Sequence, residues 1–163
     1  MLRLVLATIA VAVATAVLPA SAAAAPPDKR PFAFTVSGTV TGVCAFPFTV
    51  TSAISGHVIE FVDSTGAITR IHAHITSQDV FSANGNTLVG QTYTFTNFFW
   101  LDANGEPTAI LARGVAEKIR LPNGKLFVSA GVIDFIAQNV DFSFVTDRGR
   151  TGDVDAFCAA LAP

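Results

Sequence analysis

Apolar residues near the start of this chain recur at every second position, and this period constrains the fold more than any other feature. The stretch FAFTVSGTV, residues 32–40, alternates apolar side chains with small or polar ones, and the same phase continues to Val50. A period of two is typical of a β-strand, whose successive side chains point to opposite faces of a sheet. Pro47 falls on the other phase and has no N–H, so it marks an edge, a bulge or a bend between two strands.

Similar runs follow along the rest of the chain. The further strands that we expect cover residues 56–63, 67–77, 88–101, 108–121, 125–137 and 139–146. They are separated by the turn sequences DSTG, ANGN, DANGEP and LPNGK. With the first segment counted as two strands the total is about eight, and strands joined by short turns pair antiparallel. We therefore predict an all-β domain, as a single antiparallel barrel in preference to the alternative of a two-layer sandwich.

Residues 1–24 have the order of a secretory signal peptide: one positive charge at Arg3, an apolar run, and small residues around Ala22. The apolar run is shorter than the ~20 residues of a membrane span, and no second run of that length follows. We expect cleavage between Ala22 and Ala25. The mature protein is then secreted and extracellular, with no membrane span.

The residues after the signal divide into a tether and a domain. Residues 25–31 include PPDKRP, whose prolines prevent regular strand pairing. Residues 32–163 are expected to form the folded domain, and about 130 residues are enough to bury one core.

The end of the chain, TGDVDAFCAALAP, carries helix signals. Asp153 suits an N-cap and Asp155 lies in the first turn. The apolar residues that follow recur at helical spacing: Val154, Phe157, Cys158 and Leu161. We predict a short helix that lies on the sheet.

The chain has two cysteines, Cys44 and Cys158. Because an exported protein meets an oxidising compartment, a disulfide between them is the simplest interpretation. It would close a long loop, and in the chain-entropy model such a disulfide stabilises the folded state by roughly 4–5 kcal/mol. Two free thiols as redox or metal ligands are the alternative, but no CxxC motif supports them.

The charge balance of the mature chain is mildly acidic. The sequence has 10 basic and 12 acidic residues, so loss of Arg3 leaves 9 − 12 = −3. Nucleic-acid binding requires a basic stripe, and no basic run here is longer than Lys29-Arg30. We therefore predict no nucleic-acid partner.

The stretch TRIHAHITSQD contains His72 and His74, one residue apart. On a strand both rings lie on one face about 7 Å apart, which suits two ligands of one metal ion. The other phase of the strand is apolar, however, and predicts that both histidines face solvent.

The preceding turn decides where His57 lies. Ser64-Thr65-Gly66 fits a three-residue loop, and this register pairs Glu60 with Arg70 and places His57 on the other face. A two-residue loop would instead pair His57 with His74 and gather three histidines on one face. We favour the first register.

The same stretch resembles the first motif of the cupins, which are metal-binding β-barrels. The similar positions are Gly66, His72, His74, Asp79 and Gly85. Asp79 stands where cupins have Glu, and Gly85 comes one residue early. Pro122-Asn123-Gly124 resembles the turn of the second cupin motif, but Phe127 occupies the position of its histidine. The resemblance implies a metal-dependent enzyme with ligands His72, His74 and Asp79, as the alternative to a protein without a metal or another cofactor.

Other chemistry is sparse, and no catalytic residue is assigned. The sequence lacks a Gly-x-Ser-x-Gly motif. Asp134 lies within GVIDFIA and is a candidate general base if it points into the barrel. We favour a position at a wet rim, because Phe127 and Ile133 give the opposite phase a comparable apolar face.

The run TYTFTNFFWL presents aromatic residues on both phases. Phe98 and Trp100 share one phase, while Phe95 and Phe99 share the other. If the sheet buries only one face, one of these two pairs lies outside the core. That pair forms an exposed aromatic ligand surface or, as we favour, is covered by the C-terminal helix.

Three features together resemble a group of small secreted proteins common in actinobacteria. These are the Cys-x-Phe-Pro segment at 44–47, the Leu-Pro-x-Gly turn at 121–124 and the cysteine near the C-terminus. The resemblance implies a secreted bacterial protein with a compact β domain and a disulfide, and it supplies no functional residue. We expect non-catalytic binding of an apolar small molecule or an envelope component, with a cell-surface interaction module or the cupin-like enzyme as alternatives.

Overall fold

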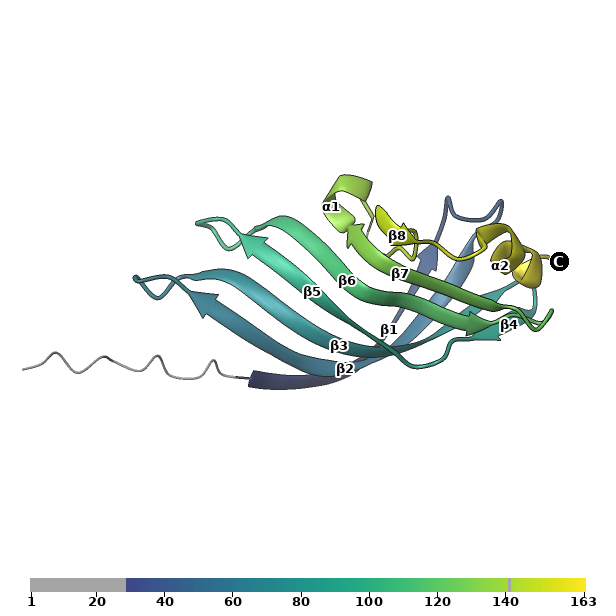
Figure 1. Ribbon diagram of the computed structural model, residues 1–163, viewed down its shortest axis with the longest axis horizontal. Helices are drawn as coiled ribbons and strands as arrows, with labels where there is room; N and C mark the ends of the chain where they lie inside the picture. Colours follow the sequence, from purple (N-terminus) through teal and green to yellow (C-terminus); the bar gives the residue numbers. More distant parts are fainter. Residues whose placement is uncertain (1–28, 141) are drawn as a thin grey trace, which may run out of the picture.

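The computed structural model describes residues 29–140 and 142–163 (Figure 1). The predicted signal peptide and its cleavage site lie outside the described residues. The last residues of the predicted tether belong to the first strand, in which Pro31 lies opposite His57. In the described part of the chain no helix is long and apolar enough to cross a membrane.

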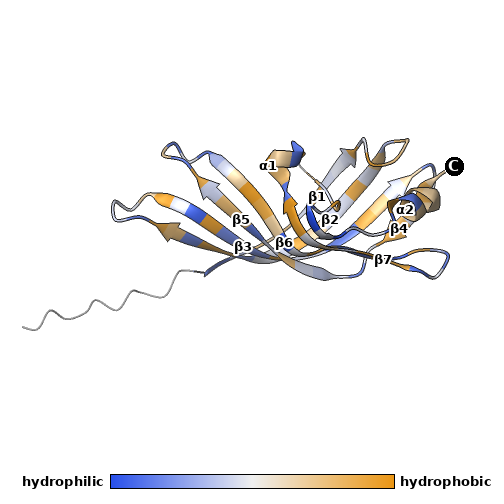
Figure 2. Ribbon diagram, turned by 45° about the horizontal axis from the view of Figure 1, so that its top comes forward, coloured by the Kyte–Doolittle hydropathy of each residue, from blue (hydrophilic) through white to orange (hydrophobic). Residues whose placement is uncertain are grey.

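Antiparallel strands form one sheet, as the period of two predicts. The strands are β1 (Lys29–Val40), β2 (Phe48–Val62), β3 (Ile68–Ala83), β4 (Asn86–Val89), β5 (Tyr93–Leu101), β6 (Pro107–Arg120), β7 (Leu126–Asp134) and β8 (Arg148–Arg150). Their order is β1-β2-β3-β5-β6-β7-β8, and β4 pairs with β3. Pairing among the described residues does not return from β8 to β1, so the sheet is open and a closed barrel is not confirmed. Figure 2 shows the sheet bent into a trough.

Two of the expected strands differ in the structure. Residues 88–101 contain both β4 and β5, which separate at Gly90. The described residues of 139–146 form no strand, because the chain leaves the sheet in the short helix α1 (Phe135–Gln138). The Asp134 carboxylate accepts a hydrogen bond from the Ala137 N–H at 2.9 Å and caps this helix. A local side-chain cap thus ends the strand although the apolar pattern continues.

The two faces of the sheet have different surroundings. We call the inner face the one that carries Phe48, Phe81 and Phe127 and both helices, and the outer face the opposite one (Figure 1). The helix α2 (Val154–Leu161) packs Phe157 and Leu161 against the inner face near β4, and both side chains are fully buried. This end of the inner face is the hydrophobic core.

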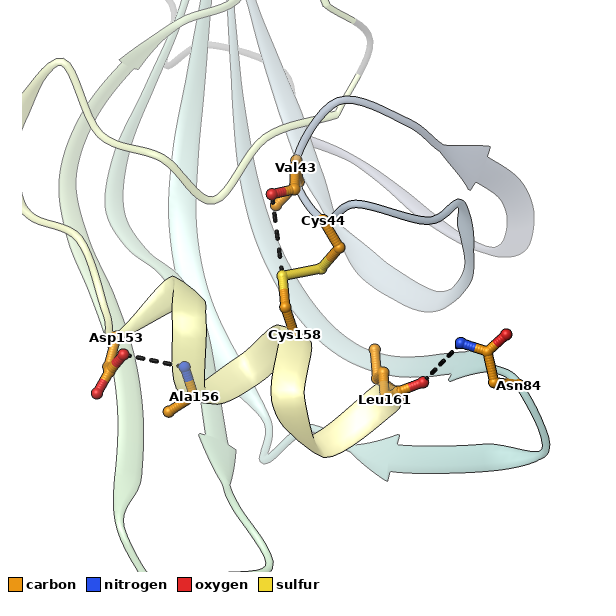
Figure 3. Close-up of a disulfide and its surroundings, with 7 residues drawn as sticks. All are labelled: Val43, Cys44, Asn84, Asp153, Ala156, Cys158 and Leu161. Atoms are coloured by element: carbon orange, nitrogen blue, oxygen red, sulfur yellow. Dashed lines mark hydrogen bonds between the residues drawn. A yellow bond between two sulfur atoms is a disulfide. The ribbon is translucent and has the colours of Figure 1, made fainter. Parts of the chain in front are cut away.

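The C-terminal helix and the disulfide agree with the sequence predictions (Figure 3). The Asp153 carboxylate accepts a hydrogen bond from the Ala156 N–H at 3.0 Å and caps α2. Cys158 in α2 is bonded to Cys44 in the loop between β1 and β2, with a Cα–Cα distance of 5.5 Å. The Asn84 side chain donates to the Leu161 carbonyl at 3.0 Å, so α2 is fixed at both ends.

Candidate functional site

A cleft of about 640 Å³ occupies the inner face beyond the core. Its lining is mostly apolar and comes from β1, β2, β3, β5, β6, β7 and the segment around α1. On the β1 side the wall includes Phe34 and Val36, which are 55% and 49% exposed. The exposure of these two side chains shows that nothing in the described chain covers this wall. The cleft is therefore accessible at the edge of the sheet.

Small side chains on the central strands create the space. Ala73 on β3, Asn97 on β5 and Ala112 on β6 are direct cross-strand neighbours on the inner face. Both alanines are buried at the floor of the cleft. Phe95 and Phe99, the neighbours of Asn97 along β5, rise beside them and line the cleft. A low row of alanines between taller aromatic side chains leaves a depression in the sheet.

Asn97 is the polar group in this row. Its Oδ1 atom is buried and has no hydrogen-bond partner among the described residues. A buried amide oxygen without a partner costs about 1–3 kcal/mol relative to a paired one. The Asn97 side chain lines the cleft, and a small rotation of its amide would bring Oδ1 within reach of a bound hydroxyl or N–H group.

A second polar group lies where the cleft meets the core. Asp79 and Ser77 on β3 and Tyr93 on β5 line the cleft, and Asp79 is fully buried. The Tyr93 hydroxyl donates to Asp79 Oδ2 at 2.7 Å, and the Ser77 hydroxyl donates to Asp79 Oδ1 at 2.9 Å. Each oxygen of this carboxyl group is thereby satisfied inside the protein.

Glu117 on β6 completes this buried cluster. Its side chain is fully buried, and its Oε1 atom accepts a hydrogen bond from the Lys118 N–H at 2.8 Å. Burial, and then the charge of nearby Asp79, raises the pKa of Glu117 to about 9. Glu117 therefore carries a proton at neutral pH. Burial also raises the pKa of Tyr93, with contributions from Glu117 and Asp79.

The sequence interpretation did not find Glu117 or Tyr93. A signal for Glu117 was present, because it shares its phase with Ile119 and Leu121, which are both buried. An acidic residue on the apolar phase of a strand indicates a buried acid. Asp79 was considered only as a metal ligand, although it lies two residues before the buried Phe81 on the same face.

The metal ligands expected from the cupin resemblance do not come together. His72 and His74 are on the outer face of β3, whereas Asp79 is on its inner face. No three His, Cys, Asp or Glu residues within the described ranges are grouped to hold a metal ion. Phe127, at the position of the last cupin histidine, is buried in the core.

The predicted hairpin register is wrong by one residue, and His57 lies on the outer face with the other two histidines. β2 pairs His57 with His74 and Ile59 with His72, and the first two rings are 4.9 Å apart. The expected pair of Glu60 and Arg70 is absent. Burial, followed by the charges of Arg70 and His74, lowers the pKa of His72.

A β-bulge causes this shift. The turn itself is the expected three-residue loop, since the Asp63 N–H donates to the Ala67 carbonyl and Gly66 has a φ of 88°. Val62 pairs with Ile68, but Phe61 then pairs with Arg70, which leaves Thr69 as the extra residue. One added residue shifts every later residue of β3 by one position relative to β2, so that His74 rather than Ala73 lies opposite His57.

The remaining candidates have structural surroundings. Asp134 caps α1 and lies on the phase opposite to the buried Ile133. Phe98 and Trp100 are on the outer face, where their rings stack at 6.1 Å between centroids. The expected cover by the C-terminal helix is wrong, because α2 packs at the other end of the sheet (Figure 1). The Arg113 guanidinium instead lies over Phe98, 5.1 Å from its centroid.

The fold and the cleft define an open antiparallel β-sheet protein with a largely apolar internal surface, closed at one end by a disulfide-bonded helix. We find no protein-family model, no curated protein and no solved structure that matches the chain.

Proposed function

We propose that this is an exported protein that binds an apolar small molecule in the inner-face cleft, without catalysis. The observation that carries the proposal is the cleft of about 640 Å³ with its mostly apolar lining. Small-molecule sites are typically concave and apolar, span about 300–1,000 Å³, and contain a few well-placed polar groups. A Cys44–Cys158 disulfide is consistent with an oxidising, extracellular setting.

The polar groups of the cleft define the kind of ligand. Asn97 Oδ1 is an unpaired acceptor between Ala73 and Ala112, so the ligand should present a hydroxyl or N–H group there. The remaining contacts are with apolar side chains such as Phe95 and Phe99. An apolar molecule with one hydrogen-bond donor along its length fits this arrangement better than a hydrocarbon or an ionic compound.

The buried acid cluster supports binding rather than catalysis. Glu117 does not line the cleft, and the Asp79 oxygens already accept bonds from Ser77 and Tyr93. A general acid or base must reach the reacting group within about 3 Å. This cluster is instead a rigid polar boundary between the cleft and the core.

Binding of a neutral lipophilic fluorescent probe, N-phenyl-1-naphthylamine, tests the proposal. The purified mature protein should bind one probe per chain with saturation. Ala73→Phe should abolish binding because the added ring fills the floor of the cleft. Ala53→Phe is the matched control, since Ala53 is exposed on the outer face of β2.

The control should retain full probe binding. Circular dichroism and thermal melting of both variants establish that each is folded. Absence of saturable binding by the wild type, or equal loss in two folded variants, would contradict a ligand site on the inner face.

A further inference from the structure

The basic residues of the described strands gather on the outer face of the sheet. Cross-strand pairing places seven of the nine Lys and Arg residues of segment 29–163 there: Lys29, Arg70, Arg113, Lys118, Arg120, Arg148 and Arg150. His57, His72 and His74 share this face. Asp134 is the one acidic residue at an outer-face position of the described strands, and it caps α1. The acidic strand residues Glu60, Asp79 and Glu117 are on the inner face.

The centre of this basic face is a row that crosses six strands. His57, His74, Thr96, Arg113, Val132 and Arg148 are successive cross-strand neighbours from β2 to β8, with β3, β5, β6 and β7 between. Neighbouring strands are about 4.8 Å apart, so Arg113 and Arg148 are separated by roughly 10 Å. A parallel row of hydroxyl groups from Ser55, Thr76 and Thr94 lies beside it.

The cations of this face have no described carboxylate partner. The salt bridge found among the described residues joins Arg30 to Glu60, away from the outer face. Arg113, Arg120, Arg148 and Arg150 are all exposed. Unpaired charges of one sign on one face create a directional field even when the net charge of the chain is negative. The partner for which this face is complementary is therefore an anion with several charges.

Two features of the face narrow the class of anion. The Phe98 ring is contacted by Arg113, Trp100 and His72, so it is not free to stack on nucleic-acid bases. The face is also the convex side of the bent sheet, which a flat membrane would touch along a strip (Figure 2). A flexible polymer can follow this curvature, and hydroxyl groups beside cations match the hydroxyl and acidic groups of a charged sugar chain.

We propose that the outer face binds an anionic polysaccharide, with Arg113 and Arg148 at the centre of the contact. This inference does not depend on the cleft, because its residues lie on the opposite side of the sheet. The same molecule would then hold a small ligand on one face and remain attached to a charged surface polymer on the other.

Dextran sulfate, with uncharged dextran as the reference, is the probe for this test. Wild-type protein should bind dextran sulfate at low ionic strength and should not bind dextran. The logarithm of its binding constant for dextran sulfate should fall linearly with the logarithm of the salt concentration. The double substitution Arg113→Gln with Arg148→Gln should weaken binding about tenfold and reduce the salt slope, because two ionic contacts are lost.

Arg30→Gln with Lys125→Gln is the matched control. It removes the same net charge, but Arg30 is on the inner face and Lys125 lies in the β6–β7 turn. The control should change affinity less than about twofold, since rim and remote charges act mainly at long range. N-phenyl-1-naphthylamine binding should be unchanged in both double variants, which separates this test from that of the cleft.

Three outcomes would overturn the proposal. One is an equal loss of affinity in both double variants, which would show an effect of net charge alone. Another is no binding of dextran sulfate at low salt. The third is tighter binding of single-stranded DNA or of phosphatidylglycerol vesicles than of dextran sulfate under the same conditions, which would assign the face to a different partner.

Discussion

The two ends of the inner face are built from the same strands but pack in opposite ways. At one end phenylalanine rings fill the space, and the rings of Phe81 and Phe157 meet edge to face at 5.2 Å. At the other end Ala73 and Ala112 leave the cleft. The difference follows from the size of the floor side chains and from the cover, because α2 supplies additional apolar groups only at the filled end.

This division separates stability from binding. The filled end has the buried rings, the capped helix and the disulfide, all of which act against unfolding. The cleft end has exposed apolar side chains and an unpaired acceptor, which are unfavourable in the free protein. Changes at the filled end should therefore lower stability, and changes at the cleft end should mainly alter binding.

The largest effect is expected from removal of the disulfide. Cys44→Ser with Cys158→Ser opens a loop with a sequence separation of 114 and should lower the free energy of unfolding by roughly 4–5 kcal/mol. Urea denaturation of both proteins measures this difference. Wild-type protein denatured without reductant should contain no titratable thiol, and two thiols per chain would contradict the disulfide.

Substitution of one core ring should have an effect of comparable size. Phe157→Ala should cost about 3–5 kcal/mol, because the side chain is fully buried among other rings. Phe34→Ala is the matched control at the cleft end, and with 55% exposure it should cost less than about 1 kcal/mol. Equal losses in urea denaturation would mean that the two ends do not differ as described.

The buried acid at the boundary should make stability depend on pH. The pKa of Glu117 is raised to about 9 in the folded state from an ordinary value of 4.5, so the folded protein holds a proton that the unfolded chain releases. Its contribution is complete below pH 4.5 and is lost as the pH rises towards 9, by at most about 1.4 kcal/mol per pH unit.

Glu117→Gln tests this dependence, because an amide keeps the shape of the protonated acid without titrating. The free energy of unfolding of the variant should fall less steeply between pH 5 and pH 9 than that of the wild type. Glu106→Gln, in the exposed β5–β6 turn, should retain the wild-type slope. If the free energies of unfolding of the wild type and Glu117→Gln change with pH in parallel, Glu117 is not the cause of the pH dependence.

The smallest effect should come from the floor of the cleft. Asn97→Leu removes a buried acceptor that has no described partner and should raise the free energy of unfolding by about 1 kcal/mol. The change should weaken binding of hydroxyl-bearing apolar ligands more than that of pure hydrocarbons, as titration calorimetry can measure. A loss of stability would indicate that Asn97 is paired in the folded protein.

The amino-acid sequence by itself determined the features that depend on near neighbours along the chain. The period of two set the strands, Gly66 set the turn, Asp153 set the start of α2, and two cysteines left one disulfide to form. Each follows from local geometry or from the absence of another partner. The apolar pattern did not separate β4 from β5, and it did not reveal that Asp134 turns the chain into a helix.

Tertiary structure alone decided the register, the cleft and the distribution of charge. One bulge at Thr69 moved His57 to the face of His74, and a bulge of this kind recurs where Thr108 is extra between β5 and β6. Basic residues that alternate along strands never form a run in the sequence, yet pairing of β6, β7 and β8 places Arg113 in line with Arg148. The physical reason is that a strand fixes only which side chains share its face, whereas the neighbours across the sheet depend on every residue inserted between them.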